Sequence, residues 1–329
     1  METSPVDAQK PVRRAKDDEL VTVLDGDRSE VELDDAALTG LYLGMVRTRL
    51  TDEGLARLAA EGRTHVHIPT RGQEAAVIGA AAALADEDWI FPTVRDLGAF
   101  LYRGVSLGRV VANAFGNAAD AAKGRQMPAH LTARAERIAS VGSLAGTHLS
   151  HAAGLAWAAK ISGDPVVVAA FADREAVPSA DFHTGLNFAA VFDAPAVFVF
   201  RNALRQGRTT PVAPKGVAYG MAGVRADGDD VLAVHAVVAE AADKARRGGG
   251  PTLVELVTGG ADSVERFGAW LSRAGVFDTA AQDAARAKVR ADLDSAVDKA
   301  ARVGAPARST LFDDVYASIP KHLEEQRDS

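Results

Sequence analysis

The stretch DPVVVAAFADREAVPSADFH, residues 164–183, joins an apolar run to a helical pattern through a short polar turn. The run lacks polar alternation, which is typical of a parallel strand that is covered on both faces. A turn that holds a phosphate between such a strand and the next helix usually contains glycine, because the backbone must approach the ligand closely. Arg174 and Glu175 occupy this turn instead. The stretch therefore predicts a strand, a turn and a helix, and raises the question of whether the turn holds a phosphate.

The surrounding sequence repeats this alternation of apolar runs and helical patterns. Strands are expected at residues 88–93, 165–171, 194–202 and 251–258, and helices at 73–84, 148–162 and 180–192. Strands that alternate with helices are typical of a sheet wrapped by those helices. We therefore predict an α/β fold with a central, mainly parallel sheet, helices on both of its faces, and a helical C-terminal tail.

Three segments are expected along the chain of 329 residues. Residues 1–33 are polar and aperiodic, so they are interpreted as an N-terminal arm that lies on a partner or remains free. Residues 34–261 are predicted to form the α/β domain. Residues 262–329 are predicted to form a helical C-terminal extension that packs on the same domain.

The composition excludes several classes of chemistry. The chain contains no cysteine, so disulfides, thiol nucleophiles and cysteine-bound zinc are absent. The formal net charge of -7 makes a nucleic acid an unlikely partner. No apolar segment has the length of a signal peptide core or of a membrane span, so no membrane association and a cytoplasmic location are expected.

Several segments carry a resemblance to a known family. They are LYLGMVRTRLTDEGLARLAAEGR, RGQEAAVIGAAAAL, EDWIFPTVRDLGAFLYRGV, GRQMPAH, DFHTGLNFAAVFDAPAVFVFRN and VAYGMAGVRADGDDVLAV. In this order and spacing, from about residue 35 onward, they resemble the α subunit of the E1 component of pyruvate and branched-chain 2-oxo acid dehydrogenase complexes. The resemblance implies a thiamine-diphosphate-binding fold, thiamine diphosphate and Mg²⁺ as cofactors, and an E1 β-type partner in an α2β2-like assembly. It also implies contact with the E2 lipoyl acyltransferase.

The resemblance assigns five candidate cofactor-binding residues. Arg95 and Arg201 match arginines that grip the diphosphate, and Asp173 matches the aspartate that binds magnesium. Asn202 matches the first residue of an Asn-Asn pair, and Ser143 matches a residue of a cofactor-facing turn. The residues themselves leave alternatives open, because both arginines could equally serve ion pairs and Asp173 could equally cap a helix. No catalytic residue is predicted.

The sequence departs from the family pattern at three places in this site. Ala172 and Arg174 replace the glycines that flank the metal-binding aspartate, and Ala203 replaces the second asparagine, which ligates magnesium in the family. The loop that follows residues 251–258 in the family carries a histidine, whereas this chain has no histidine between His235 and His322. These departures predict a degenerate magnesium and thiamine diphosphate site, with Asp173 as a vestigial metal ligand.

Three functions are therefore considered. The leading one is an E1 α-like subunit that serves assembly or regulation of a 2-oxo acid dehydrogenase. The second is an active E1 α subunit that, with β, decarboxylates a 2-oxo acid and acylates lipoyl-E2. The third is a sensor that binds an anion or metabolite in the relict pocket.

The remaining histidines favour structural roles. His65 and His67 have the i, i+2 spacing of a metal pair but no third ligand in view, which favours a surface or interface role. His148 and His151 lie in a turn that the family uses near its cofactor, and they are interpreted as part of a retained structural turn. His183 is expected at a subunit interface.

Overall fold

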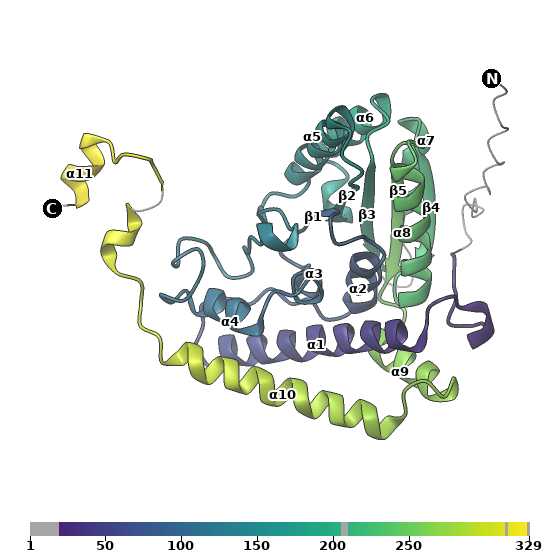
Figure 1. The fold of residues 1–329 in the computed structure, drawn as a ribbon, viewed down its shortest axis with the longest axis horizontal. Helices are drawn as coiled ribbons and strands as arrows, with labels where there is room; N and C mark the ends of the chain where they lie inside the picture. Colours follow the sequence, from purple (N-terminus) through teal and green to yellow (C-terminus); the bar gives the residue numbers. More distant parts are fainter. Residues whose placement is uncertain (1–19, 205–209, 313–314, 328–329) are drawn as a thin grey trace.

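A five-stranded parallel sheet forms the centre of the molecule in the computed structural model, which describes residues 20–204, 210–312 and 315–327 (Figure 1). Its strand order is β1-β2-β3-β5-β4. The strands are β1 (Trp89–Phe91), β2 (Val168–Asp173), β3 (Ala196–Ala203), β4 (Ala222–Asp227) and β5 (Thr252–Thr258). The predicted α/β fold and its four expected strands are confirmed, and β4 was not predicted.

The register of β2 and β3 determines where the candidate site lies. Asp173, the last residue of β2, is paired in register with Arg201 of β3. The carboxyl ends of parallel strands lie at the same edge of a sheet, and ligands of open α/β sheets usually bind at that edge. Strand pairing alone therefore makes Asp173 and Arg201, two of the predicted site residues, neighbours.

Helices cover both faces of the sheet, as predicted. On one face lie α5 (Thr147–Ser162) and α6 (Ala180–Val191), which pack Leu149 and Phe182 against Phe198 and Phe200. On the other face lie α2 (Glu74–Ala82) and α8 (Val231–Arg246). These two helices pack very closely, because a Cβ atom on Gly79 would lie 2.7 Å from the carbonyl oxygen of Val231.

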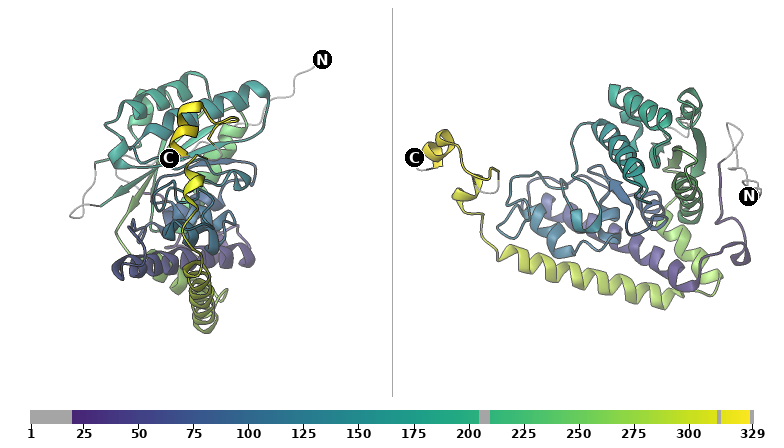
Figure 2. Two further views of the ribbon diagram at one scale, coloured as in Figure 1. Left: turned by 90° about the vertical axis from the view of Figure 1, so that its left-hand side faces the viewer. Right: turned by 45° about the horizontal axis from the view of Figure 1, so that its top comes forward.

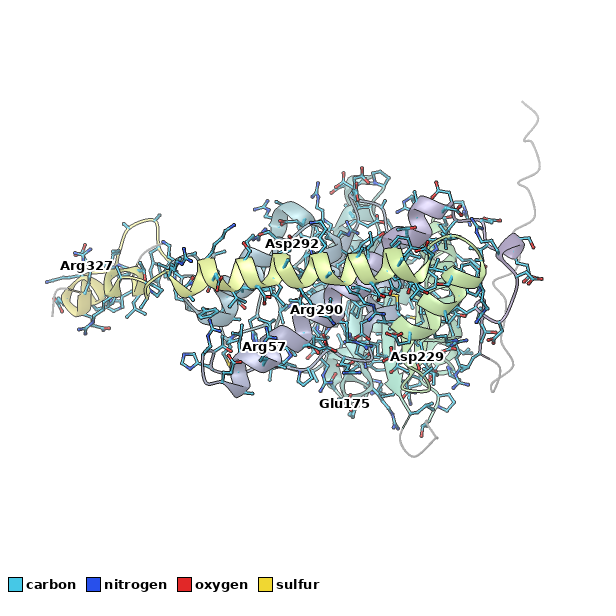
Figure 3. The ribbon with its side chains drawn as sticks, turned by 90° about the horizontal axis from the view of Figure 1, so that it is seen from below. Arg57, Glu175, Asp229, Arg290, Asp292 and Arg327 are labelled. Carbon is cyan, nitrogen blue, oxygen red and sulfur yellow. The ribbon has the colours of Figure 1, made fainter. Side chains whose placement is uncertain are left out.

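A layer of further helices lies along one edge of the sheet. It contains α1 (Asp35–Ala60), α3 (Leu97–Tyr102), α4 (Leu107–Phe115), α9 (Ser263–Arg273) and α10 (Thr279–Ala301). Figure 3 shows α10 lying across this side of the molecule, with Arg57 of α1 beside it. Leu293 of α10 reaches so close to Gly54 of α1 that a Cβ there would lie 2.4 Å from it.

The described part of the predicted N-terminal arm lies on the chain's own sheet. Val21 forms a parallel bridge with Ala226 of β4, and Leu24 is buried. Asp230 accepts hydrogen bonds from the backbone N–H groups of Val23 and Leu24 at 2.6 and 2.7 Å. Residues 20–24 therefore extend the sheet beyond β4, while residues 1–19 lie outside the described part of the chain.

The chain leaves the body after α10. The backbone still contacts the body at Gly304, whose carbonyl accepts a hydrogen bond from Ala118, and then continues away from it (Figures 1 and 2). We call residues 307–312 and 315–327, which include α11 (Lys321–Arg327), the C-terminal arm. Leu311 and Tyr316 on this arm are 60% and 55% exposed, so apolar side chains here face solvent. Helices α9 and α10 pack on α1, whereas the arm lies apart from the body.

The remaining short elements are 3-10 helices at Arg28–Glu30, Arg134–Glu136, Arg174–Ala176 and Arg308–Leu311, and α7 (Lys215–Ala218). None of the helices in the described part of the chain has the length and hydrophobicity needed to cross a membrane.

Candidate functional site

A small cleft lies at the carboxyl edge of β2 and β3. Its volume is about 170 Å³, and its described lining residues are Gln73, Arg95, Asp173, Arg174, Glu175, Arg201 and Ala203. Three of the five predicted cofactor-binding residues, Arg95, Asp173 and Arg201, therefore meet here. Since a water molecule occupies about 30 Å³ in the liquid, the cleft has room for a few waters or a small anion.

Arg201 is buried under this cleft and is fully engaged by other residues of the chain. Its guanidinium donates to the carboxylate of Asp96 and, at 2.9 Å, to Oδ1 of Asp173. It also donates to Oγ1 of Thr93 at 3.0 Å. Burial alone would lower the pKa of Arg201, but the charges of Asp96 and Asp173 outweigh burial and raise it. Arg201 is thus a charged residue whose counter-ions belong to the protein.

Asp96 is the partner of Arg201 that sequence reasoning missed. It has no exposed surface, and its second oxygen accepts hydrogen bonds from the backbone N–H of Thr93 at 2.6 Å and from its hydroxyl at 2.8 Å. Burial raises the pKa of Asp96 more than Arg201 lowers it. The signal in the sequence is a threonine followed three residues later by an aspartate, which is common in polar turns and therefore carries little information.

Arg95 belongs to the same turn, but its side chain is half exposed to solvent. Its side chain is 49% exposed, and its Nε lies 3.8 Å from Oδ2 of Asp173. Asp173 thus has one oxygen bonded to Arg201 and the other close to Arg95. Both oxygens of the predicted metal ligand face guanidinium groups of the chain itself.

The turn between β2 and α6 has no glycine and forms a short 3-10 helix at Arg174–Ala176. Arg174 and Glu175 both line the cleft, and Glu175 lies at the surface (Figure 3). Ser179 then caps α6, because its hydroxyl accepts a hydrogen bond from the backbone N–H of Phe182 at 3.1 Å. The N-terminus of α6 is therefore capped by a side chain of the chain itself.

Asn202 lies away from the cleft. Successive side chains of a strand point to opposite faces, and Asn202 is buried, where its amide donates to Glu255 at 2.7 Å and to the carbonyl of Thr210 at 2.9 Å. The Glu255 carboxylate also accepts from Arg225 of β4 at 3.2 Å. Ala203, which does line the cleft, offers no side-chain oxygen. The assignment of Asn202 as a cofactor ligand gains no support from this arrangement.

Ser143 lies on a neighbouring loop and is not among the described residues that line the cleft. Its hydroxyl is hydrogen-bonded to the ring of His130, and its side chain is exposed. The loop ends at Gly146, whose φ of +89° and close approach to Ser179 exclude a larger residue. His148, in the first turn of α5, is buried, and its Nε2–H donates to the carbonyl of Phe171 at 2.7 Å. This contact lies within the chain, and the structural role of the turn stays a prediction.

The connection between β5 and α9 consists of residues 259–262 only. The carboxylate of Asp229 accepts hydrogen bonds from three consecutive backbone N–H groups, those of Gly259, Gly260 and Ala261, at 3.2, 2.7 and 2.9 Å. Asp262 then caps α9 and pairs with the buried Arg49 at 3.0 Å. The sequence predicted that the family's long, histidine-bearing loop is missing here. In its place the structure has the short connection of residues 259–262, which is hydrogen-bonded to Asp229.

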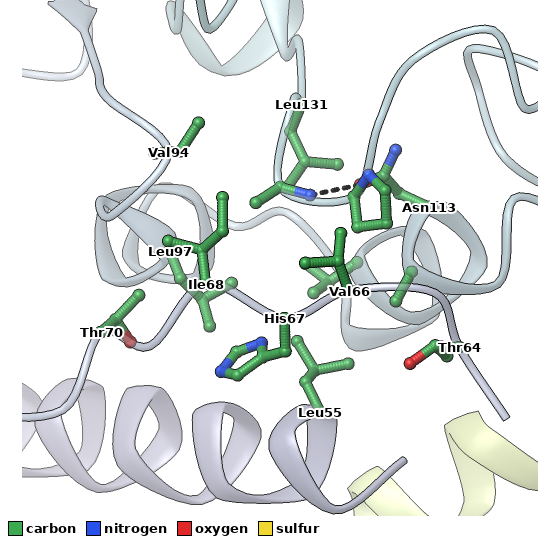
Figure 4. Close-up of a pocket in the computed structure, with 14 residues that line it drawn as sticks. Leu55, Thr64, Val66, His67, Ile68, Thr70, Val94, Leu97, Asn113 and Leu131 are labelled. Atoms are coloured by element: carbon green, nitrogen blue, oxygen red, sulfur yellow. Dashed lines mark hydrogen bonds between the residues drawn. The ribbon is translucent and has the colours of Figure 1, made fainter. Parts of the chain in front are cut away.

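A second, smaller cavity of about 30 Å³ lies beside Val94 and Leu97 (Figure 4). It is lined mainly by apolar side chains, among them Leu55, Val94 and Leu97. His67 forms part of its wall and bonds to Oδ1 of Asp52 at 2.8 Å. Burial favours a raised pKa for Asp52, but the hydrogen bonds from His67 and Thr70 outweigh burial and lower it. His67 is thus a partner of a buried aspartate.

Two further histidines, His65 and His183, either face solvent or have a partner within the chain. His65 is exposed, and His183 on α6 is hydrogen-bonded to the hydroxyl of Tyr219. Within the described ranges, no three His, Asp or Glu side chains are grouped so that they could hold a metal ion.

The charges around the cleft balance within the chain. Three arginines, Arg95, Arg174 and Arg201, face three carboxylates, those of Asp173, Glu175 and the underlying Asp96. A diphosphate with its magnesium requires spare positive charge and backbone N–H groups for the phosphates, and spare oxygens for the metal. The described residues that line this cleft meet neither requirement, so they do not fit magnesium and thiamine diphosphate.

Comparison with known proteins defines the family. Residues 42–260 match the family described as the dehydrogenase E1 component. The chain is 35% identical to the 3-methyl-2-oxobutanoate dehydrogenase subunit alpha of Mycobacterium tuberculosis, over 90% of this chain and 87% of that protein. It is 31% identical to the 2-oxoisovalerate dehydrogenase subunit alpha 1 of Arabidopsis thaliana, over 87% of this chain and 68% of that one. The human 2-oxoisovalerate dehydrogenase subunit alpha is 30% identical, over 88% of this chain and 72% of its own.

The parallel sheet, with a cleft at the carboxyl ends of its strands, places the chain in a class of α/β proteins. Proteins of this class bind a cofactor at that edge of the sheet. Within this class, the chain belongs to the dehydrogenase E1 component family and is of the α-subunit type.

Proposed function

We propose that this chain is an E1 α-type subunit of a branched-chain 2-oxo acid dehydrogenase system that pairs with a β-type subunit in an α2β2-like assembly. It does not bind magnesium and thiamine diphosphate in the family manner, and it serves assembly or regulation. The names of the relatives, which refer to 3-methyl-2-oxobutanoate and 2-oxoisovalerate, support the branched-chain assignment. Any contact with the E2 lipoyl acyltransferase would follow from membership of that assembly.

The observation that carries this proposal is the pairing of Arg201 with Asp173. A family-type site would use the arginine to bind diphosphate and the aspartate to bind magnesium. Here the two residues lie 2.9 Å apart and neutralise each other, while Asp96 provides a second buried counter-ion. A cofactor would have to break these bonds before it gained its own, and a buried charge that loses its partner costs several kcal/mol, about 3–5.

The test is a calorimetric titration of thiamine diphosphate with Mg²⁺ into the chain co-purified with its β-type subunit. We expect no binding heat from the unmodified complex. A variant with Arg174→Gly and Ala203→Asn restores space for the phosphate and an oxygen for the metal, so it is expected to bind, but only weakly, because the pairing of Arg201 with Asp173 remains in place. A variant with Arg134→Gly and Ala118→Asn, which changes the same residue types away from the cleft, serves as the control.

Micromolar, Mg²⁺-dependent binding by the unmodified complex would overturn the proposal in favour of an active E1 α subunit with an altered site. The same instrument tests the third function. Titration with inorganic phosphate in place of the cofactor would give binding heat if the cleft were an anion sensor, and we expect none because its charges are balanced.

A further inference from the structure

A serine and a histidine form a hydrogen-bonded pair in the segment that precedes α5. Oγ of Ser143 lies 2.5 Å from Nε2 of His130. Ser143 is exposed and His130 is partly buried, so the pair is open to solvent. Neither residue is among the described residues that line the cleft at the carboxyl edge of the sheet or the smaller cavity. The pair is therefore a separate feature, which the proposed function does not use.

The other ring nitrogen of His130 determines which atom carries the proton. Nδ1 lies 3.1 Å from the carbonyl oxygen of Pro128. A carbonyl oxygen only accepts hydrogen bonds, so Nδ1 carries the hydrogen of the neutral ring and donates it. Nε2 is then without a hydrogen and accepts the hydrogen bond from the hydroxyl of Ser143. The ring is thus held as a base that faces a hydroxyl group.

This arrangement is that of an activated nucleophile. A serine hydroxyl is a weak nucleophile until an adjacent base takes its proton, and a third group usually orients that base. Here Ser143 provides the hydroxyl, His130 is the base, and the carbonyl of Pro128 orients the ring. A carboxylate in the third position would stabilise the charged ring more strongly than a carbonyl does. We therefore expect a slow reaction.

The backbone around Ser143 provides the hydrogen-bond donors that acyl transfer needs. Within the part of the chain that the structure describes, the N–H groups of residues 142–148 donate no hydrogen bond to another group of the protein. The N-cap of α5, Gly146, lies in this stretch and has no side chain to cap the helix. In serine hydrolases, N–H groups of the nucleophile and of residues near it stabilise the oxyanion. The N–H groups of Ser143 and Leu144 are available for this task.

The surroundings of the pair indicate the kind of substrate. Leu144, which directly follows the serine, is 72% exposed, and Met127, three residues before the histidine, is 60% exposed. Such side chains offer contacts to an apolar acyl group. Residues 142–145 are all exposed, so the place is open and does not enclose a ligand. A small, uncharged acyl group fits these surroundings.

We propose that Ser143 and His130 form a catalytic dyad that hydrolyses carboxylic esters with a short, uncharged acyl group. Oγ of Ser143 attacks the carbonyl carbon while its proton passes to Nε2 of His130. The bond from that carbon to the alcohol oxygen then breaks, and Nε2 gives the proton to the departing alcohol. Water attacks the acyl-serine, its proton passes to Nε2, and Oγ takes this proton as the acid leaves.

The net reaction consumes one ester and one water and releases one acid and one alcohol. It goes beyond the proposed function and does not depend on it, because neither thiamine diphosphate nor a β-type subunit takes part.

The first experiment measures the release of p-nitrophenolate from p-nitrophenyl acetate by the full chain. We expect Ser143→Ala and His130→Gln each to lower the rate above buffer by about a hundredfold or more, the usual contribution of a general base. Ser162→Ala and His151→Gln are the controls, since they change the same residue types at exposed positions of α5. These controls are expected to keep the rate of the unmodified chain. Circular dichroism establishes that each variant is folded.

The second experiment uses the absence of cysteine from the chain. A Ser143→Cys variant contains a single thiol, and the base that accepts the hydroxyl proton would also accept the thiol proton. The thiolate is the form that reacts with iodoacetamide. At neutral pH we expect alkylation about tenfold faster than in a Ser162→Cys variant. Addition of His130→Gln to the Ser143→Cys variant is expected to remove this difference.

Three outcomes would overturn the dyad. They are an unmodified chain that hydrolyses the ester no faster than buffer, a folded Ser143→Ala variant that keeps the full rate, and equal alkylation rates in the two cysteine variants. The alkylation rates decide the question even if the Ser143→Ala variant fails to fold. The proposed function stands in each case, because the titration with thiamine diphosphate tests it separately.

Discussion

Arg201 forms three of the polar contacts beneath the cleft, with Asp96, Asp173 and Thr93. A guanidinium can bind carboxylates in the same planar geometry with which it binds phosphate. The presence of a matching arginine in the sequence therefore does not indicate which of the two it binds. In this chain, the carboxylates of Asp96 and Asp173 are the partners.

Replacement of Arg201 by methionine is expected to destabilise the fold by about 3–5 kcal/mol, because it leaves the buried Asp96 without its counter-ion. The measurement is the free energy of unfolding from urea titration at neutral pH. Arg95→Met is the matched control, since Arg95 is half exposed and its ion pair is expected to contribute less than about 1 kcal/mol. Equal losses in the two variants would contradict the role assigned to Arg201.

At the scale of elements, the short connection between β5 and α9 depends on a carboxylate from another strand end. Asp229 binds three successive N–H groups of residues 259–261. Burial raises its pKa, although the three backbone hydrogen bonds act in the opposite direction. Successive backbone N–H groups also bind free anions in this way, but here the anion is a carboxylate of the chain itself.

Asp229→Ala is expected to lower the free energy of unfolding by about 1–3 kcal/mol, because buried N–H groups lose their acceptor. Hydrogen exchange should show faster exchange at residues 259–262 in particular. Asp243→Ala, at an exposed position of α8, provides the comparison and is expected to change stability by less than about 0.5 kcal/mol. Unchanged protection of residues 259–262 would show that Asp229 does not hold the connection.

The sequence predicted the strands whose residues are mainly apolar and missed β4, in which a glycine and an arginine interrupt the apolar run. In β4, Gly223 lies so close to Ala213 that a Cβ would be 2.2 Å from its carbonyl oxygen, and Arg225 is buried beside Glu255. A glycine and an arginine weaken a strand pattern, and only the tertiary contacts explain them. The same reason applies to Asp96 and Asp229, whose partners are distant in sequence.

The residues of the candidate site were assigned by the resemblance and not by the strand pattern. The register of β2 and β3 explains why two of them, Asp173 and Arg201, lie side by side. The direction in which a side chain points at the end of a strand depends on register, so Asn202 could be placed on the strand but not on a face of it. The structure places it against Glu255 instead of the cleft.

At the scale of the whole molecule, the described residues form one body from which the C-terminal arm extends (Figure 2). The arm has exposed apolar residues at Leu311, Val315 and Tyr316. Its backbone beyond Pro306 has no sheet or long helix to protect it, and such segments are preferred sites of proteolysis.

Brief digestion of the isolated chain with trypsin is expected to cleave first after Arg308 or Lys321 in the arm and to leave the body intact. Mass spectrometry of the products gives the sites. An Arg308→Gln variant should shift the first cleavage to Lys321, because the arm stays accessible when one site is removed. Early cleavage within α5 or α8 would contradict this description of the molecule.

The mutual neutralisation of Arg201 and Asp173 also affects how such a protein can change over generations. A single substitution that reopened the turn for a phosphate would still leave the arginine bound to its carboxylates, and one that removed a carboxylate would leave an unbalanced charge in the core. Neither first step toward a cofactor site thus brings a gain in binding, and the second also costs stability. On the function proposed above, the ion pair would act as an evolutionary ratchet that keeps cofactor binding from arising by single mutations.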